Sequence, residues 1–184
     1  MNREQAINLL HQHIKNDRMI AHCIASEAVM KALARHLGQD EEKWGLAGLL
    51  HDLDVEITNA DLNIHGLETE KILKENNVDP EIIDAIKMHN TQAHGIPRST
   101  VFHHALAAGE TITGMIMATT FVYPDKKIAG VKSKSVTKRM KEKAFAASVS
   151  REHILECEKI GISLDVFAEI SVNAMKEIAD QIGL

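Results

Sequence analysis

Apolar residues recur at every third or fourth position along most of this chain, and this spacing decides which fold it can adopt. Residues with that spacing share one face of an α-helix. The segment 18–37 carries such a stripe at Ile20, Ile24, Ala28, Val29, Leu33 and Leu37. The segment 164–182 carries another at Val166, Ile170, Ala174, Ile178 and Ile182. The chain has only three prolines, and its helical patterns do not alternate with strand patterns, so we predict an all-α fold.

Residues that begin and end helices divide the chain into segments. Asp79-Pro80 is a typical helix start, with Asp at the N-cap and Pro at the first helical position. We expect Asp17 to cap the second helix, and Gly38 and Gly161 to end helices. The predicted helices span residues 3–15, 18–37, 41–51, 66–76, 80–89, 100–121, 135–143, 151–159 and 164–182.

The size and composition indicate one soluble globular domain over residues 1–184. Hydrophobic residues make up 45% and charged residues 26% of the chain, as in ordinary globular proteins. No apolar run approaches the roughly 18 residues of a membrane span, and the polar N-terminus does not have the pattern of a signal peptide. Cys23 and Cys157 are far apart in sequence, and we interpret them as reduced thiols. These features predict a cytoplasmic protein without a membrane partner.

The charge is unevenly distributed. Residues 122–143 hold eight Lys or Arg and two Asp or Glu, a balance of +6, so the rest of this chain of net charge −5 carries −11. A basic segment on an acidic protein indicates an anionic partner or substrate, although a solvated lysine-rich loop explains it equally well. A nucleic-acid duplex is not the expected partner, because the acidic remainder would repel it and aromatic residues make up only 3%.

The sequence GLLHDLD, residues 48–54, places His51 and Asp52 at the end of an apolar helical run. Neighbouring residues on a helix point roughly 100° apart, so both can reach one point only if the helix ends there. Imidazole nitrogens and carboxylate oxygens are good ligands for Zn, Mn or Fe. The chain contains eleven histidines, so further ligands are available.

Four other residues have helical positions that suit this site. His22 lies early in the helix 18–37, His65 precedes a helix, His89 ends one, and Glu110 lies in the apolar middle of another. Each alone has a structural explanation, such as a salt bridge for Glu110 or a favourable helix-dipole interaction for His89. As a set they predict a metal site.

The order of these residues resembles that of the HD-domain metal-dependent phosphohydrolases. The similar segments are AGLLHDLD (47–54), HGLETEKIL (65–73), AIKMHN (85–90) and ALAAGETITGMI (105–116). The resemblance covers residues 18–120 approximately. Its spacing is most similar to the two-metal branch, which includes bacterial diadenosine tetraphosphate hydrolases.

This resemblance implies an HD-domain helical bundle with additional C-terminal helices and a central site for one or two divalent ions. It implies that His22, His51, Asp52 and Glu110 hold one metal, and that Asp52 bridges to a second held by His65 and His89. The choice among Fe, Mn and Zn, with Mg as a further candidate, stays open.

The expected activity is attack by a metal-bound hydroxide on a small phosphorylated substrate, with a nucleotide preferred and Asp52 as the catalytic residue. The expected substrate-binding residues are Arg98, His94, Lys132 and Lys134, with Lys138, Arg139, His103 and His104 as further candidates. Thr111 and Thr113 are expected to be packing residues.

Two positions depart from the family pattern. Glu110 stands where the family usually has Asp, and the Lys that often follows His-Asp is replaced by the sequence Asp54, Val55, Glu56. Residues 121–184 match no well-known member. The two departures favour a non-catalytic metal- or nucleotide-binding regulator as one alternative. The resemblance implies a second, a di-iron oxygenase, since some proteins of this fold are oxygenases, and a homodimer is left open.

Overall fold

The computed structural model describes residues 1–184 and contains ten α-helices, three short 3-10 helices and no strand. The predicted all-α fold is confirmed. The α-helices are α1 (Arg3–His13), α2 (Asp17–Leu37), α3 (Glu41–Leu50), α4 (Leu67–Glu75), α5 (Pro80–His89), α6 (Val101–Phe121), α7 (Ser133–Arg139), α8 (Arg151–Leu155), α9 (Leu164–Glu177) and α10 (Ala179–Ile182). The 3-10 helices are Thr91–Ala93, Ile128–Gly130 and Glu156–Ile160.

Most helix ends follow their sequence signals. Asp79 caps α5, where its side chain accepts a hydrogen bond from the Glu81 amide. The predicted N-cap Asp17 is wrong, because the side chain of Asn16 accepts the Arg18 amide and Asp17 is already helical. The helix expected over 164–182 breaks at Ile178, where the backbone amide bonds three residues back to Met175 and tightens the last turn of α9.

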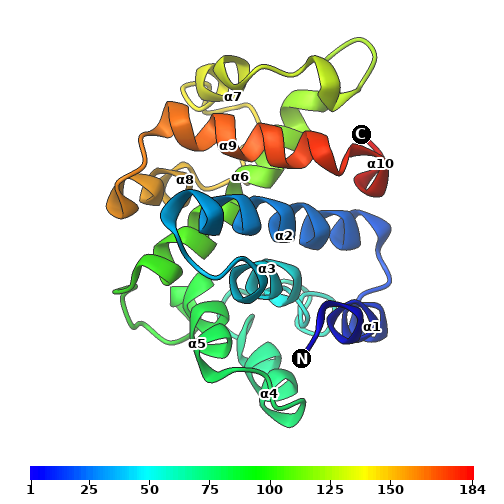
Figure 1. Cartoon of the computed structure of the whole chain (residues 1–184), viewed down its shortest axis with the longest axis vertical. Coiled ribbons are helices and arrows are strands. Elements are labelled where there is room, and N and C mark those ends of the chain that lie inside the picture. Colours follow the sequence, from blue (N-terminus) through cyan, green and yellow to red (C-terminus); the bar gives the residue numbers. More distant parts are fainter.

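Helix α2 lies in the middle of the molecule, with α9 along one side of it and α3 along the other (Figure 1). Helix α6 contacts α2, α5, α8 and α9, so it links the N-terminal helices to the C-terminal ones. The core between them is mostly aliphatic, with Phe167 fully buried and Trp44 stacked on Phe102. Its largest fully buried side chains include Leu33, Leu49, Leu50, Leu106 and Ile112.

Glycine allows α2 and α3 to approach closely. A Cβ atom at Gly48 would lie 2.5 Å from the carbonyl oxygen of Ser26 and 2.7 Å from its carbonyl carbon, which no real side chain can tolerate. This contact between backbones holds the C-terminal end of α3 against α2. As a consequence, the rings of His22 on α2 and His51 after α3 lie with their centroids 5.0 Å apart.

None of the helices combines the length and hydropathy that a membrane crossing requires. Cys23 and Cys157 are both free and buried, as expected for thiols that pack as small apolar groups.

Candidate metal centre

Five residues from four separate parts of the chain converge beside α6. His22 comes from α2, His51 and Asp52 from the turn that ends α3, His65 from the residues before α4, and His89 from the last position of α5. Ligand atoms of His22, His51 and Asp52 all lie within 4.8 Å of one another, and so do those of Asp52, His65 and His89. Asp52 belongs to both groups, which we call the first triad and the second triad.

The carboxylate of Asp52 lies between the imidazoles. Its Oδ1 is 3.1 Å from Nε2 of His65, 3.3 Å from Nε2 of His51 and 3.6 Å from Nε2 of His89. Its Oδ2 is 3.6 Å from Nε2 of His22. Oδ1 therefore faces both histidines of the second triad and His51 of the first, and Oδ2 faces His22, so the carboxylate contacts members of both triads.

Hydrogen bonds at Nδ1 settle which nitrogen of two histidines can bind a metal. Nδ1 of His51 lies 2.8 Å from the Gly48 carbonyl oxygen, and Nδ1 of His89 lies 2.5 Å from the Ile86 carbonyl oxygen. A carbonyl oxygen only accepts, so both Nδ1 atoms carry hydrogen and donate. The lone pair of each neutral ring is then on Nε2, which faces the centre.

The other two histidines are oriented by side chains. Nδ1 of His22 donates to Oγ1 of Thr113 at 2.8 Å, because the Thr113 hydroxyl already donates to the Glu110 carbonyl at 2.6 Å. Nδ1 of His65 lies 2.7 Å from Oδ1 of Asp54. All four rings therefore direct Nε2 into the centre, the arrangement in which an outer acceptor fixes a metal-ligating histidine.

The resulting pairs of Nε2 atoms are close together. Nε2 of His22 and Nε2 of His51 are 3.2 Å apart, and those of His65 and His89 are 3.0 Å apart. Two lone pairs cannot hydrogen-bond to each other, so each pair needs a cation, either a proton or a metal ion. The donor set thus fits divalent metal ions that accept imidazole and carboxylate ligands.

Burial and neighbouring charges shift the pKa values of the ionisable groups in the centre. Burial and the neighbouring His51 lower the pKa of His22 to about 4. Burial also opposes charge on His65, but its hydrogen bonds to Asp52 and Asp54 raise the pKa to about 10. Burial would raise the pKa of Asp52, yet the surrounding histidines hold it well below its usual value. Asp52 is therefore a charged carboxylate, and the surrounding imidazoles can hold the compensating positive charge.

Glu110 lies at the edge of the first triad. Its Oε2 is 3.8 Å from Nε2 of His22, and its other oxygen accepts the hydroxyl of Thr111. Burial raises the pKa of Glu110 to about 7, although His51 acts in the opposite direction. The structure brings Glu110 to the centre but outside the closest ligand groups.

Asp54 is a site residue whose role the sequence did not reveal. It is fully buried, and its Oδ2 accepts the amides of Gly66 at 2.7 Å and Thr69 at 3.2 Å. Burial would raise its pKa, but His65 and these amides lower it. The available signal was a second acid two residues after Asp52, between Leu53 and Val55.

The comparisons with known proteins agree with this geometry. A family model described as HD domain matches residues 19–118, which is more than half of the chain. The chain belongs to the HD domain family. The matched residues contain both triads and Glu110, and they agree with the predicted range of 18–120. No match was found among curated proteins or among solved structures.

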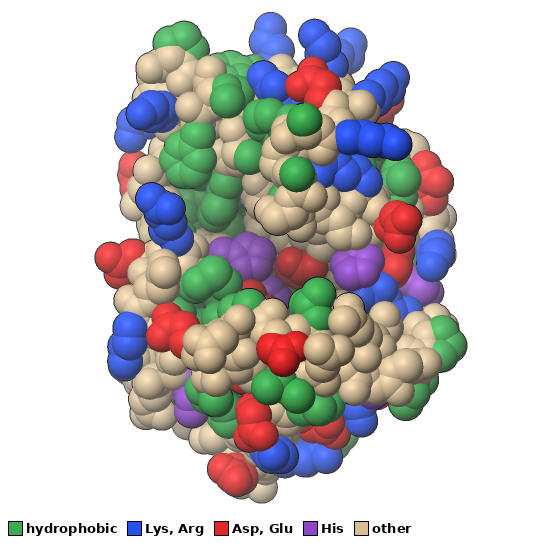
Figure 2. Space-filling model, turned by 180° about the vertical axis from the view of Figure 1, so that it is seen from behind, with side chains coloured by type: hydrophobic (Ala, Val, Ile, Leu, Met, Phe, Trp, Pro, Cys, Tyr) green, Lys and Arg blue, Asp and Glu red, His purple; other side chains and the backbone are tan.

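A pocket of ≈ 530 Å³ opens onto the candidate metal centre of this HD domain. Figure 2 shows histidine and acidic side chains in a hollow across the middle of one face. Its lining includes His22, Asp52, His65, His89 and Glu110. The pocket thus gives a small molecule access to the shared carboxylate.

The expected substrate-binding residues are not among the residues that line this pocket. Arg98 is the clearest case, because its guanidinium donates to the carbonyl oxygens of Met88 and His89 and pairs with Glu156 at 2.7 Å. With its donors used inside the protein, Arg98 fixes the end of α5 instead of contacting phosphate.

The other candidates have different positions from those expected. Nε2 of His94 donates to the Lys87 carbonyl at 3.2 Å. Lys132 and Lys134, at the start of α7, are also outside the pocket lining. The two further histidines form ion pairs elsewhere, His103 with Asp84 and His104 with Glu156, each at 2.7 Å.

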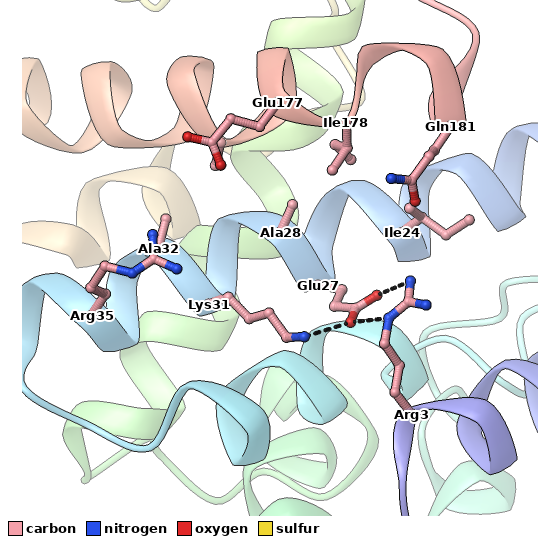
Figure 3. A pocket seen from close by; sticks show the side chains of 11 residues that line it. Arg3, Ile24, Glu27, Ala28, Lys31, Ala32, Arg35, Glu177, Ile178 and Gln181 are labelled. Carbon is pink, nitrogen blue, oxygen red and sulfur yellow. Dashed lines mark hydrogen bonds and ion pairs between the residues drawn. The ribbon is translucent and has the colours of Figure 1, made fainter.

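A second hollow, of ≈ 280 Å³, lies between α2 and the helices α9 and α10 (Figure 3). The buried carboxylate of Glu27 lies at its edge, 2.7 Å from Nε of Arg3 and 3.1 Å from Nζ of Lys31. These charges satisfy one another, so the cluster ties α1 to α2 and offers no free group to a ligand.

Proposed function

We propose that this HD-domain protein is a metal-dependent phosphohydrolase that acts on a small phosphorylated molecule. The observation that supports this function best is the pair of facing Nε2 contacts, 3.2 Å and 3.0 Å, on either side of one carboxylate. Two cation sites joined by a shared carboxylate are the arrangement used to clamp a phosphoryl group during in-line displacement.

In this proposal the first triad, with Glu110 beside it, holds one ion and the second triad holds the other. The four imidazoles suit Fe, Mn or Zn better than Mg, which prefers an oxygen-only ligand set. Bound divalent ions supply an acidified water and neutralise charge on the phosphoryl oxygens.

The chain itself orients and encloses the reacting groups. Asp54 and Thr113 hold His65 and His22 with Nε2 toward the centre. Asn90 holds the segment before α4, because its amide donates to the carbonyls of Leu62 at 2.8 Å and His65 at 2.9 Å. These outer contacts reduce the reorganisation that binding would otherwise require.

The decisive experiment combines metal analysis with activity. We expect His51→Ala to lose the ion of the first triad and His89→Ala to lose that of the second, with release of inorganic phosphate from phosphorylated substrates abolished in the first variant. Assays after reconstitution with Mn, Fe or Zn identify the active ion. Full metal retention in both variants, or no phosphate release by metal-loaded protein, would overturn the proposal. An activity that required O₂ would favour the oxygenase alternative.

A further inference from the structure

Part of the pocket is built by residues outside the HD match. Ser148, Val149, Ser150 and His153 line it together with the metal centre, and all four follow residue 118. We call these four residues the C-terminal wall. We propose that this wall selects the substrate, and that the substrate is a phosphomonoester whose remainder is small, uncharged and rich in hydroxyl groups. This inference rests on the proposed function.

The C-terminal wall is held in place by one arginine. The guanidinium of Arg151 donates to the carbonyl oxygens of Ala146 at 2.6 Å, Val149 at 2.7 Å and Glu142 at 3.2 Å, and also to that of Phe145. Ala146 has φ of 44°, a left-handed conformation that is costly for a residue with a side chain. Several hydrogen bonds to one loop keep that strained conformation, so the wall is a defined surface.

The wall also rests directly on the helix that carries Glu110. A Cβ atom at Gly114 would lie 3.2 Å from Cγ2 of Val149, so the valine occupies the space that a side chain at this position of α6 would need. Gly114 is one helical turn beyond Glu110. The C-terminal wall therefore lies next to the first triad and faces whatever is bound there.

Several polar groups of the lining have hydrogen-bonding capacity left over. No hydrogen bond within the protein uses the Ser148 hydroxyl or either ring nitrogen of His153, whose backbone amide donates to Ser150 Oγ. The Ser150 hydroxyl accepts that bond at 3.2 Å and keeps its proton to donate. The Thr91 hydroxyl, which also lines the pocket, is free in the same way. Such groups are suited to hydroxyl groups of a ligand.

The residue types that are absent from the pocket lining reduce the classes of substrate that fit it. The 17 lining residues include no Lys, Arg, Phe, Tyr or Trp. A second or third phosphate would meet no Lys or Arg side chain in this lining. A nucleobase would find no Phe, Tyr or Trp ring on which to stack. The inference thus favours a single phosphate at the metal centre over the dinucleoside polyphosphates that the sequence resemblance suggested.

Steady-state kinetics of the full-length, metal-loaded protein test this inference. The substrates are sugar and polyol phosphomonoesters, phenyl phosphate, nucleoside mono-, di- and triphosphates, and a dinucleoside tetraphosphate. We expect kcat/KM for the best sugar or polyol monoester to exceed that for every polyphosphate at least tenfold. A preference for polyphosphates would overturn this inference and leave the hydrolase function standing.

Two variants test the role of the wall. Ser148→Ala and His153→Gln should each lower, about tenfold, the ratio of kcat/KM for the best hydroxylated monoester to that for phenyl phosphate. His36→Gln, at an exposed histidine of α2, should not change the ratio. An unchanged ratio in both wall variants, with metal content intact, would contradict the inference alone. If metal-loaded protein hydrolysed no phosphate ester at all, the proposed function and this inference would both be overturned.

Discussion

Nδ1 of His65 lies 2.7 Å from Oδ1 of Asp54, while Nε2 of the same ring lies 3.1 Å from Oδ1 of Asp52. One imidazole therefore connects a buried outer carboxylate to the carboxylate at the centre of the candidate metal site. The outer acid fixes the ring and raises its affinity for a cation, as it does in known metal sites.

The first prediction concerns this outer acid. Asp54→Asn keeps the shape of the side chain but removes the charge that favours a cation at His65. We expect metal affinity of the second triad to fall about 10- to 100-fold, as measured by metal titration of metal-free protein. Asp17→Asn removes an equal charge at an exposed position of α2 and serves as the control. Equal affinities in the two variants would show that Asp54 does not act on the metal site.

The second prediction concerns Thr113, which was expected only to pack. It is fully buried, and it also accepts the Nδ1 hydrogen of His22. Thr113→Val leaves that donor without a partner, at a cost of about 1–3 kcal/mol, and frees the ring to rotate. We expect metal binding by the first triad to weaken, as judged by the metal retained after dialysis.

A matched control for Thr113 exists on the same helix. Thr119 is also fully buried, and its hydroxyl donates to the Met115 carbonyl at 2.8 Å, but it contacts no histidine. Thr119→Val should therefore affect stability without affecting metal retention. Loss of metal to the same extent in both variants would count against an orienting role for Thr113.

The third prediction is a pH dependence in metal-free protein. The pKa of Glu110 is about 7 in the folded state, against 4.5 as the ordinary value. A raised pKa favours the protonated folded state, so the stability this carboxyl contributes is fully present below about pH 4.5 and is lost as pH rises through 7. Its side chain is 16% exposed, which reduces the loss to about 2 kcal/mol.

Glu110→Gln removes this ionisation and should make metal-free protein less sensitive to pH between 4.5 and 8. Urea denaturation at several pH values measures the difference, which should disappear near pH 4.5. A larger gain in stability at pH 4.5 than at pH 8 would contradict the assignment. Divalent metal should reduce the difference at pH 8, because a nearby cation stabilises the charged carboxylate.

The fourth prediction concerns the contact between α2 and α3. Gly48→Ala would place a methyl group 2.5 Å from the Ser26 carbonyl oxygen, so a backbone must move. We expect a loss of about 1–3 kcal/mol in the free energy of unfolding, together with reduced metal content as His22 and His51 separate. Gly130→Ala meets only an ordinary contact at 3.7 Å and should change neither quantity. Normal metal content in Gly48→Ala would show that the close contact between α2 and α3 is not needed for metal binding.

The helices could be predicted from the sequence because their signals are local. The apolar stripe of 18–37 and the pair Asp79-Pro80 depend on residues within a few turns, and both agree with the structure. The histidines could be collected as a set because each lies at a helix end or on an inward face.

Contacts between distant residues could not be predicted in this way. Arg98 was expected to bind phosphate, but its partner Glu156 is 58 residues away in a segment that matched no known pattern. The role of Asp54 depends on the turn of residues 51–66, which returns the chain so that His65 meets an acid eleven residues earlier. The periodic spacing of apolar residues indicates neither of these two contacts.

The position of Asp52 has a thermodynamic consequence. A side chain that is common to two ligand groups makes their occupancies interdependent, so the first ion to arrive changes the free energy with which the second one is taken up. By linkage, the size of that change is the same whichever group fills first. A metal titration of this protein should therefore follow a cooperative or anticooperative curve, and two identical independent constants should fail to describe it.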